Sequence, residues 1–253
     1  MPNVYKDEFL ALLGRKKAEN YVFFKEKFTY IDNKKFKYLE CNIDLDLLRA
    51  AIRLAKEKYK FTMSPNQAAI PRDRITKLTK CAQGVLAEMF IHLLLIDRYD
   101  FQVSRYDLER ETFVYKKDEY DIYIYVSGHV YEVESRSSNI HHSSVARFVE
   151  EDVIIGPYGN SVKQADELAD FHFRPIYMPS FEPFVAGEGK FVYDREFLDR
   201  TKLIITGVAT KEDFEKYARV GSLGQRGTQY LLVPAKKAGD VDRMDQKFKS
   251  VMA

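Results

Sequence analysis

Three carboxylates stand in two short neighbouring segments whose composition favours β-strands. Asp121 lies in the first segment, and Glu132 and Glu134 lie in the second. Both segments are rich in Tyr, Ile and Val, which suit a pleated, half-buried surface. Ser127-Gly128 between them fits a two-residue turn, because Gly supplies the positive φ that such turns need. The sequence therefore predicts a β-hairpin that carries all three acids.

The register of this hairpin decides which side chains meet. With a two-residue turn, Val126 pairs with His129, and counting away from the turn pairs Asp121 with Glu134. Glu132 then lies on the same face, where directly opposite residues have Cβ atoms about 4.5–5.5 Å apart. Like charges that face each other destabilise a sheet, and a divalent cation with oxygen ligands removes that penalty. We therefore expect a Mg²⁺ site, in which Mn²⁺ can substitute. A three-residue turn would move both glutamates to the other face.

The spacing of these acids resembles a known motif. Asp121, ten intervening residues and then Glu132-Val133-Glu134 are similar to the PD-(D/E)XK nuclease superfamily, in the variant of some type II restriction endonucleases where Glu replaces the usual lysine. The resemblance implies that Asp121 and Glu132 bind the metal, with the Val133 carbonyl as a third oxygen. Glu134 then binds metal or accepts a proton from the attacking water. In an alternative register that begins at Glu134, Arg136 takes the lysine position.

A fourth carboxylate, Glu88, lies in the most apolar part of a predicted helix. Gly84, Glu88 and His92 recur at a spacing of four, so one narrow polar groove follows an otherwise apolar helix. An ionised carboxylate is rarely buried without a partner. Many members of the superfamily place a helical glutamate beside the metal, and the resemblance implies that catalytic role for Glu88. A surface glutamate on a partly exposed helix is the alternative.

Polar residues after the hairpin supply hydrogen-bond donors that suit phosphate and sugar contacts. A capping-box pattern at residues 161–164 predicts a helix to about residue 171, whose N-terminus favours anions. A polar loop and simple helix capping would explain the same residues. The expected DNA contacts are Arg136, Ser137, Asn139, His141, His142, Lys163 and Gln164.

The order of predicted elements favours an α/β (α+β) fold. A helix from Ile75 to about Arg98 precedes strands at 101–104 and 112–115, the hairpin, the helix at 161–171 and a strand at 173–177. This order resembles the α-β-β-β-α-β restriction-endonuclease-like core over residues 72–178, with a mixed central sheet flanked by helices. Residues 1–70 are expected to form a helical region for recognition or dimerisation. Residues 71–253 would form the catalytic core with a C-terminal extension of strands at 203–208 and 229–233 and a helix at 211–220.

Composition describes an ordinary globular protein. The 253 residues are 45% hydrophobic and 31% charged, and the net charge is only +2. Any nucleic-acid surface must therefore be a local patch. The best candidates for phosphate contacts lie in the N-terminal region: Arg15, Lys16, Lys17, Lys34, Lys35 and Lys37.

The sequence favours a cytoplasmic protein. Cys41 and Cys81 make no disulfide framework, which suits a reducing compartment. The first residues carry no signal-peptide apolar core. The most apolar stretch, residues 85–96, is too short to span a bilayer.

These features together predict a Mg²⁺-dependent endodeoxyribonuclease, of the type II restriction kind, that cuts a specific site in double-stranded DNA. Two active sites related by a two-fold axis would cut both strands, so we expect a homodimer. One alternative is a repair, recombination or transposition nuclease with the same core. Another is a non-catalytic nucleic-acid-binding protein with a degenerate core, against which the retention of all three hairpin carboxylates argues.

Overall fold

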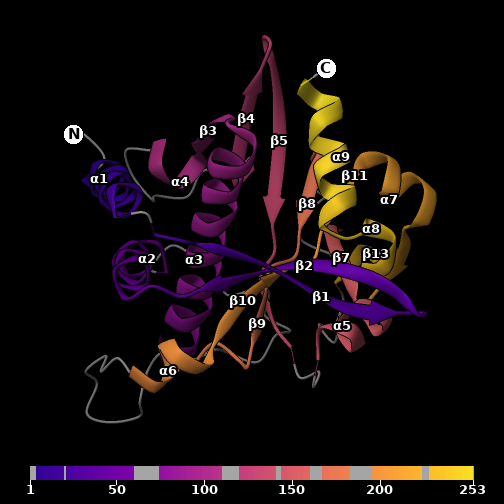
Figure 1. The fold of residues 1–253 in the computed structure, drawn as a ribbon, viewed down its shortest axis with the longest axis horizontal. Coiled ribbons are helices and arrows are strands. Elements are labelled where there is room, and N and C mark those ends of the chain that lie inside the picture. The colour runs from indigo at the N-terminus through magenta and orange to yellow at the C-terminus, as the bar shows by residue number, and fades with distance from the viewer. Residues whose placement is uncertain are drawn as a thin grey trace.

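The computed structural model describes residues 4–19, 21–59, 74–109, 120–140, 144–159, 167–182, 195–223 and 228–252. Within these ranges the chain mixes helices and strands (Figure 1). The helices are α1 (Val4–Ala18), α2 (Leu45–Lys58), α3 (Arg74–Tyr99), α4 (Tyr106–Glu109), α5 (Val145–Glu151), α6 (Arg195–Arg200), α7 (Lys211–Tyr217), α8 (Ala235–Ala238) and α9 (Val241–Met252). The strands are β1 (Phe24–Ile31), β2 (Lys34–Asn42), β3 (Gln102–Arg105), β4 (Ile122–Val126), β5 (His129–Ser135), β6 (Ser138–Asn139), β7 (Val153–Gly159), β8 (Phe171–Phe173), β9 (Ile176–Met178), β10 (Lys202–Ile205), β11 (Val208–Thr210), β12 (Arg219–Gly221) and β13 (Gln229–Pro234).

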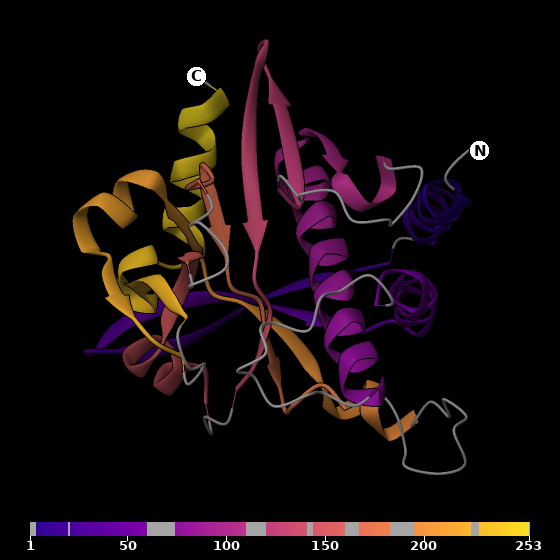
Figure 2. The ribbon, with the colours of Figure 1, turned by 180° about the vertical axis from the view of Figure 1, so that it is seen from behind.

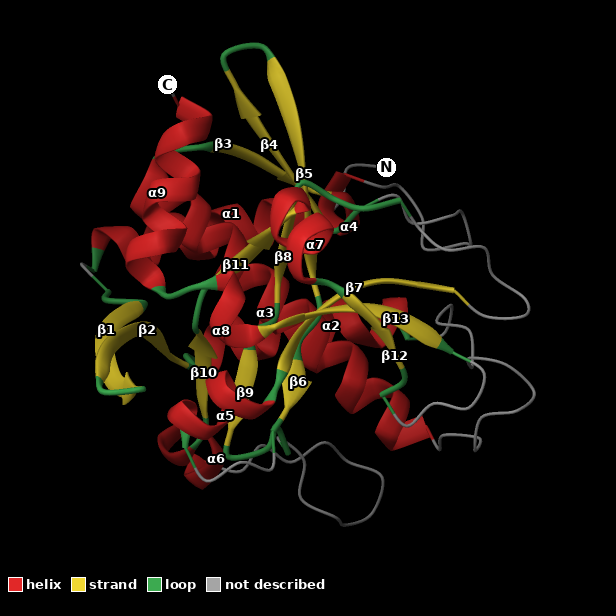
Figure 3. Ribbon diagram, turned by 90° about the vertical axis from the view of Figure 1, so that its right-hand side faces the viewer, coloured by secondary structure: helices red, strands yellow, loops and turns green. Residues whose placement is uncertain are grey.

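The described strands form three sheets (Figure 3). Sheet A has the order β1-β2-β10-β9-β6, sheet B has the order β11-β8-β5-β4-β3, and sheet C has the order β12-β13-β7. The predicted mixture of α and β structure is confirmed, and the described strands are divided among several sheets, of which sheet B contains both antiparallel and parallel pairs. Strands β1, β2, β7 and β12, which the sequence reading did not anticipate, build most of sheets A and C.

Sheet B contains the predicted hairpin, β4–β5. Strand β3 pairs antiparallel with β4, and β8 lies parallel to β5. Ile122, Ile124 and Val133 belong to the same hydrophobic cluster as the core residues of α3. Phe248 of α9 packs against Phe171 of β8, with ring centroids 4.7 Å apart. Helices α3 and α9 therefore cover the apolar face of sheet B, and the hairpin projects beyond them (Figure 1 and Figure 2).

Helix α3 confirms the predicted apolar helix and is longer than its most apolar stretch suggests. Its 26 residues are enough, by length and composition, to cross a membrane. However, 72% of its most apolar window is buried inside the protein. Burial of that kind is typical of the core helix of a globular domain.

The expectation of a helical region over residues 1–70 is wrong for residues 24–42, which form the β1–β2 hairpin. Helix α2 is confirmed, with the Asp44 side chain capping it by accepting hydrogen bonds from two backbone N–H groups. The sequence prediction missed the turn at Asp32-Asn33. The φ angles of these two residues are 48° and 61°, which are typical of a tight two-residue hairpin turn. Strand β2 also pairs with β10, so sheet A joins the N-terminal region to the C-terminal half.

The C-terminal half is partly as predicted. Helix α7 and strand β13 are confirmed, while the strand at 173–177 is divided between β8 and β9. The predicted helix at 161–171 is wrong for 167–171, because 167–170 are not helical and 171 begins β8. Its first residues, 161–166, and the strand at 112–115 lie outside the described residues.

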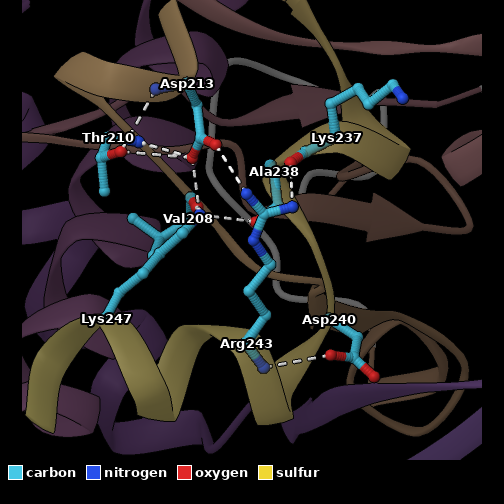
Figure 4. Close-up of polar contacts among 8 residues, drawn as sticks. All are labelled: Val208, Thr210, Asp213, Lys237, Ala238, Asp240, Arg243 and Lys247. Atoms are coloured by element: carbon cyan, nitrogen blue, oxygen red, sulfur yellow. Dashed lines mark hydrogen bonds and ion pairs between the residues drawn. The ribbon is translucent and has the colours of Figure 1, made fainter. Parts of the chain in front are cut away.

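Helix α9 is fixed to the rest of the fold by a buried ionic contact, the α9 anchor, formed by Asp213, Arg243 and Lys247 (Figure 4). The Lys247 ammonium donates to the Val208 carbonyl at 2.5 Å, to Asp213 at 2.6 Å and to the Ala238 carbonyl at 2.7 Å. Arg243 donates to the other Asp213 oxygen at 2.9 Å. All three Lys247 protons therefore have acceptors, and α9 is bound to α7, α8 and β11.

Candidate active site

The β4–β5 hairpin has the predicted register. Val126 pairs with His129, and Tyr123 pairs with Glu132. The two-residue turn is Ser127-Gly128, with φ of 49° and 82°. The predicted register is therefore confirmed from Ile122 to His129, and it puts Glu132 and Glu134 on one face of the hairpin.

Asp121 lies immediately before β4, in the position opposite Glu134. Its Oδ2 accepts a hydrogen bond from the Ser135 backbone N–H at 2.8 Å. The pKa of Asp121 is raised to about 7: burial and then the Glu134 charge raise it, while Lys58 and the Ser135 bond act in the opposite direction. The two carboxylates that face each other across the hairpin are thus electrostatically coupled.

Glu88 is buried on α3, so the alternative of a surface glutamate is wrong. Its Oε2 accepts a hydrogen bond from Arg105 Nη2 at 3.1 Å, and its Oε1 lies 3.9 Å from Lys58 Nζ. The pKa of Glu88 is raised to about 8: burial is the largest cause, the Lys58 charge lowers the pKa, and the Asp121 and Asp107 charges raise it. Glu88 therefore lies within the electrostatic reach of Asp121, as the resemblance implies.

Two further charged residues complete this site. Lys58, the last residue of α2, donates to Asp107 of α4 at 2.5 Å. Burial lowers the pKa of Lys58, but the charges of Glu88, Asp107 and Asp121 outweigh burial and hold it well above its usual range. Lys58 is therefore a permanent cation among carboxylates. We refer to Glu88, Asp107, Asp121 and Glu134 as the acidic cluster.

The sequence reading missed Lys58, Arg105 and Asp107. Arg105 is fully buried and pairs with Ile122, so it occupies a position on the apolar face of sheet B. An arginine at an apolar position of a strand is a local signal that could have been used. Lys58 and Asp107 gave no such signal, because they meet Glu88 and Asp121 only through the packing of α2, α3 and α4.

Glu132 belongs to a different group of polar side chains. It interacts with the Tyr120 hydroxyl, and its backbone N–H donates to Asp170 at 2.9 Å. Burial raises the pKa of Glu132, while the hydrogen bond from Tyr120 lowers it. Lys211 lies 3.1 Å from Asp170 in the same group. The structure therefore brings Asp121 together with Glu134 and Glu88, and it associates Glu132 with Tyr120, Asp170 and Lys211.

The residues that the sequence predicts to contact DNA lie in several different environments. Arg136 Nη2 lies 2.6 Å from Glu134 Oε1, beside the acidic cluster. Asn139 forms part of β6, and its side-chain oxygen accepts a hydrogen bond from the Phe181 N–H at 2.9 Å, which is a structural contact. Ser137 is half-buried between β5 and β6. The remaining four positions lie outside the described residues: His141, His142, Lys163 and Gln164.

The acidic cluster has the donor chemistry for a hard cation but not a preformed set of metal ligands. Among the described residues, no group of three or more His, Cys, Asp or Glu side chains is arranged to hold a metal ion. Carboxylate oxygens are nevertheless the ligands that Mg²⁺ prefers. The raised pKa values of Asp121 and Glu88 record an excess of negative charge in a desolvated place, and a divalent cation would offset that excess. Asp121, Glu134 and the Val133 carbonyl are the groups that fit such an ion.

Comparison of the chain with protein-family models, with curated proteins and with solved structures finds no match in any of the three.

Proposed function

We propose that this protein is a Mg²⁺-dependent endonuclease that hydrolyses phosphodiester bonds in double-stranded DNA, with its active site at the acidic cluster. The observation that carries the proposal is the placement of Asp121 opposite Glu134, with the buried Glu88 close enough for the Asp121 charge to raise the pKa of Glu88. Folding tolerates such crowding of like charge only at a cost, because each desolvated carboxylate is destabilised by the others. Clusters of this kind are concentrated at catalytic sites.

The topology of sheet B supports the proposal. Helix α3 is followed by the antiparallel strands β3, β4 and β5, and β8 then lies parallel to β5. This is the order that the resemblance to the PD-(D/E)XK superfamily implies. It places Asp121 before the second strand of the meander and Glu134 near the end of the third, which is where the motif requires them.

In this mechanism Asp121 and Glu134, with the Val133 carbonyl, would hold the metal, and Glu88 would support them from α3. When bound, Mg²⁺ would supply an acidified water and would neutralise charge on the phosphate. The motif of this chain lacks its usual lysine, and Lys58 on α2 would supply a positive charge to the acidic cluster instead. It remains protonated because the surrounding carboxylates raise its pKa. A fixed ammonium near the scissile phosphate would stabilise charge that develops during cleavage.

This mechanism uses Glu134 rather than Glu132 as the partner of Asp121. It corresponds to the alternative register, in which Arg136 takes the lysine position. Arg136 is held against Glu134, so it can orient that carboxylate. Glu132, together with Tyr120 and Asp170, would then contact substrate or only stabilise the hairpin.

A non-catalytic DNA-binding protein is the second candidate, and one observation favours it. Lys58 already contacts Asp107 and Glu88, and Arg136 already contacts Glu134. Three of the four carboxylates in the acidic cluster therefore have a protein cation beside them. If those ion pairs persist in solution, they compete with any metal.

Incubation of the purified protein with phage DNA and supercoiled plasmid separates the two candidates. An endonuclease cleaves in Mg²⁺ or Mn²⁺, is inactive in EDTA, and binds without turnover in Ca²⁺. Discrete bands would indicate a restriction specificity, whereas cleavage only at nicks, flaps or junctions would indicate a repair nuclease. Undiminished cleavage in excess EDTA, or no cleavage of any of these DNAs with either metal, contradicts the proposal.

A further inference from the structure

The β1–β2 hairpin is a long two-stranded projection whose outer half is little used by the core. Its eight paired positions run from Phe24 with Cys41 to Ile31 with Lys34. Strand β1 is the edge of sheet A, and the turn of the hairpin lies at the right-hand margin of Figure 1. On the outer half of the hairpin, one face carries the buried side chains of Ile31 and Phe36, which join a hydrophobic cluster with residues of α5.

Two aromatic rings on this hairpin face solvent. Phe28 is 53% exposed and Tyr30 is 62% exposed. Their ring centroids lie 5.9 Å apart and the ring planes meet at 89°. The ammonium of Lys35 lies 4.5 Å from the centre of the Phe28 ring. The hairpin therefore presents two neighbouring aromatic surfaces with a cation beside them, on a face that the described part of the chain leaves uncovered.

Four lysines of the same hairpin have no acidic partner among the residues that the structure describes. Lys25, Lys27, Lys34 and Lys35 are exposed, and none forms an ion pair with any residue that the structure describes. By contrast, two charged residues of the inner half are paired, because Glu26 contacts Arg98 and Lys37 contacts Asp242. Residues 27–36 contain three lysines and a single acid, Asp32. The outer half therefore carries an uncompensated positive charge that complements a phosphate backbone.

We propose that the outer half of the β1–β2 hairpin binds single-stranded nucleic acid, with Phe28 and Tyr30 stacking on unpaired bases and Lys35, which pairs with Tyr30 on the same face, contacting a phosphate. Aromatic side chains accept the face of any unpaired base, and a basic surface follows the backbone. In a duplex the base faces are already stacked on each other, so exposed rings gain little there. The site uses no residue of the acidic cluster and goes beyond the proposed cleavage of duplex DNA.

Fluorescence anisotropy with a fluorescein-labelled oligothymidine, in EDTA and with the full-length chain, tests this site without any metal-dependent reaction. The double substitution Phe28→Ala and Tyr30→Ala should weaken binding about tenfold or more, since stacking on each ring contributes substantially. Lys35→Glu should weaken binding and flatten its salt dependence, because Lys35 lies beside the Phe28 ring. Tyr125→Ala is the matched control, because Tyr125 is an exposed aromatic of the other hairpin, and it should leave binding unchanged. Circular dichroism melting of each variant shows whether the fold is retained.

Equal affinity of the wild type and the double variant for the oligonucleotide overturns the proposal. It is also overturned if the wild type prefers a duplex of the same sequence, or binds phosphatidylserine vesicles but not the oligonucleotide. A dimer in sedimentation that dissociates on Phe28→Ala and Tyr30→Ala, without oligonucleotide binding, would assign this face to a second copy of the chain. Asp121→Asn should bind the oligonucleotide like the wild type. A failure of DNA cleavage therefore leaves this test unaffected.

Discussion

The acidic cluster and the α9 anchor use the same kinds of side chain to opposite effect. At the anchor, the single carboxylate of Asp213 meets two cations, Arg243 and Lys247, and backbone carbonyls accept the remaining Lys247 protons. At the acidic cluster, four carboxylates meet three cations: Lys58, Arg105 and Arg136. At the anchor both Asp213 oxygens and all three Lys247 protons have a partner, as a structural contact needs. The cluster retains an excess of negative charge that packing alone would not favour.

The largest effect that this comparison predicts is the loss of cleavage on Asp121→Asn or Glu134→Gln. Each change should lower the cleavage rate about 100-fold or more, because a metal-binding carboxylate is removed. The melting temperature without metal should hold or rise, because the change relieves repulsion within the cluster. Plasmid cleavage and calorimetry of the same samples measure both quantities. A variant that cleaves at the wild-type rate removes its carboxylate from the mechanism.

The α9 anchor should behave in the opposite way. Asp213→Ala leaves the buried Lys247 ammonium without its carboxylate, and removal of one partner from a buried pair costs about 3–5 kcal/mol of unfolding free energy. Partial exposure of Arg243 places the expected loss near the lower end of that range. Urea denaturation measures it. A loss below about 1 kcal/mol, the size expected of a surface ion pair, would show that the anchor is not a structural centre.

The sequence predicts the part of the site that is local and misses the part that is not. The hairpin register follows from a two-residue turn and the alternation of apolar side chains, so the face shared by Asp121 and Glu134 could be read directly. Lys58 and Asp107 are far from the hairpin in sequence, and no periodic pattern links them to it. The same limit applies to sheet A, where β2 pairs with β10 across more than half of the chain. The β1–β2 hairpin was missed for a different reason, since its Asp32-Asn33 turn was overlooked within a basic segment.

The two regions should also differ in their response to pH. The folded-state pKa values of Asp121 and Glu88 are raised to about 7 and about 8. At pH values above the pKa of these carboxyls in the unfolded chain, the metal-free native state keeps protons that the unfolded state has released. The unfolding free energy therefore falls as the pH rises toward 8. His92 and His172 have pKa values lowered to about 3 by burial, and they destabilise the fold only below about pH 6.5.

Between pH 6.5 and 8, acidification of the metal-free protein should therefore add about 1–2 kcal/mol to the unfolding free energy. Asp121→Asn removes one of the two titrating groups and should reduce this slope, whereas Asp213→Asn should leave it unchanged. Denaturation at a series of pH values in EDTA provides the measurement. A flat profile for the wild type would show that the cluster carries no excess charge, and the contrast with the α9 anchor would then disappear.

The smallest expected effect distinguishes the two glutamates of the hairpin. Glu132 contacts Tyr120 and lies near Asp170 and Lys211, whereas Glu134 faces Asp121. Glu132→Gln should therefore lower cleavage less than about tenfold, well short of the loss expected for Glu134→Gln, because it removes no ligand of the proposed metal. Both substitutions keep the size of the side chain and its hydrogen-bonding oxygen, so they are matched controls for each other.

Single-turnover cleavage and Mn²⁺ binding by titration calorimetry separate the contributions of the two glutamates. Glu134→Gln should weaken Mn²⁺ binding and cleavage together, whereas Glu132→Gln should bind Mn²⁺ like the wild type. The reverse pattern would place the metal between Asp121 and Glu132, and the pairing of Asp121 with Glu134 would then mark the edge of the active site rather than its centre. Equal losses in both variants would mean that the metal, or a pair of metals, spans the whole polar face of the hairpin. In that case the matched pairing of Glu132 with Tyr120 must open before catalysis, since the same carboxylate cannot keep that hydrogen bond and serve as a full metal ligand.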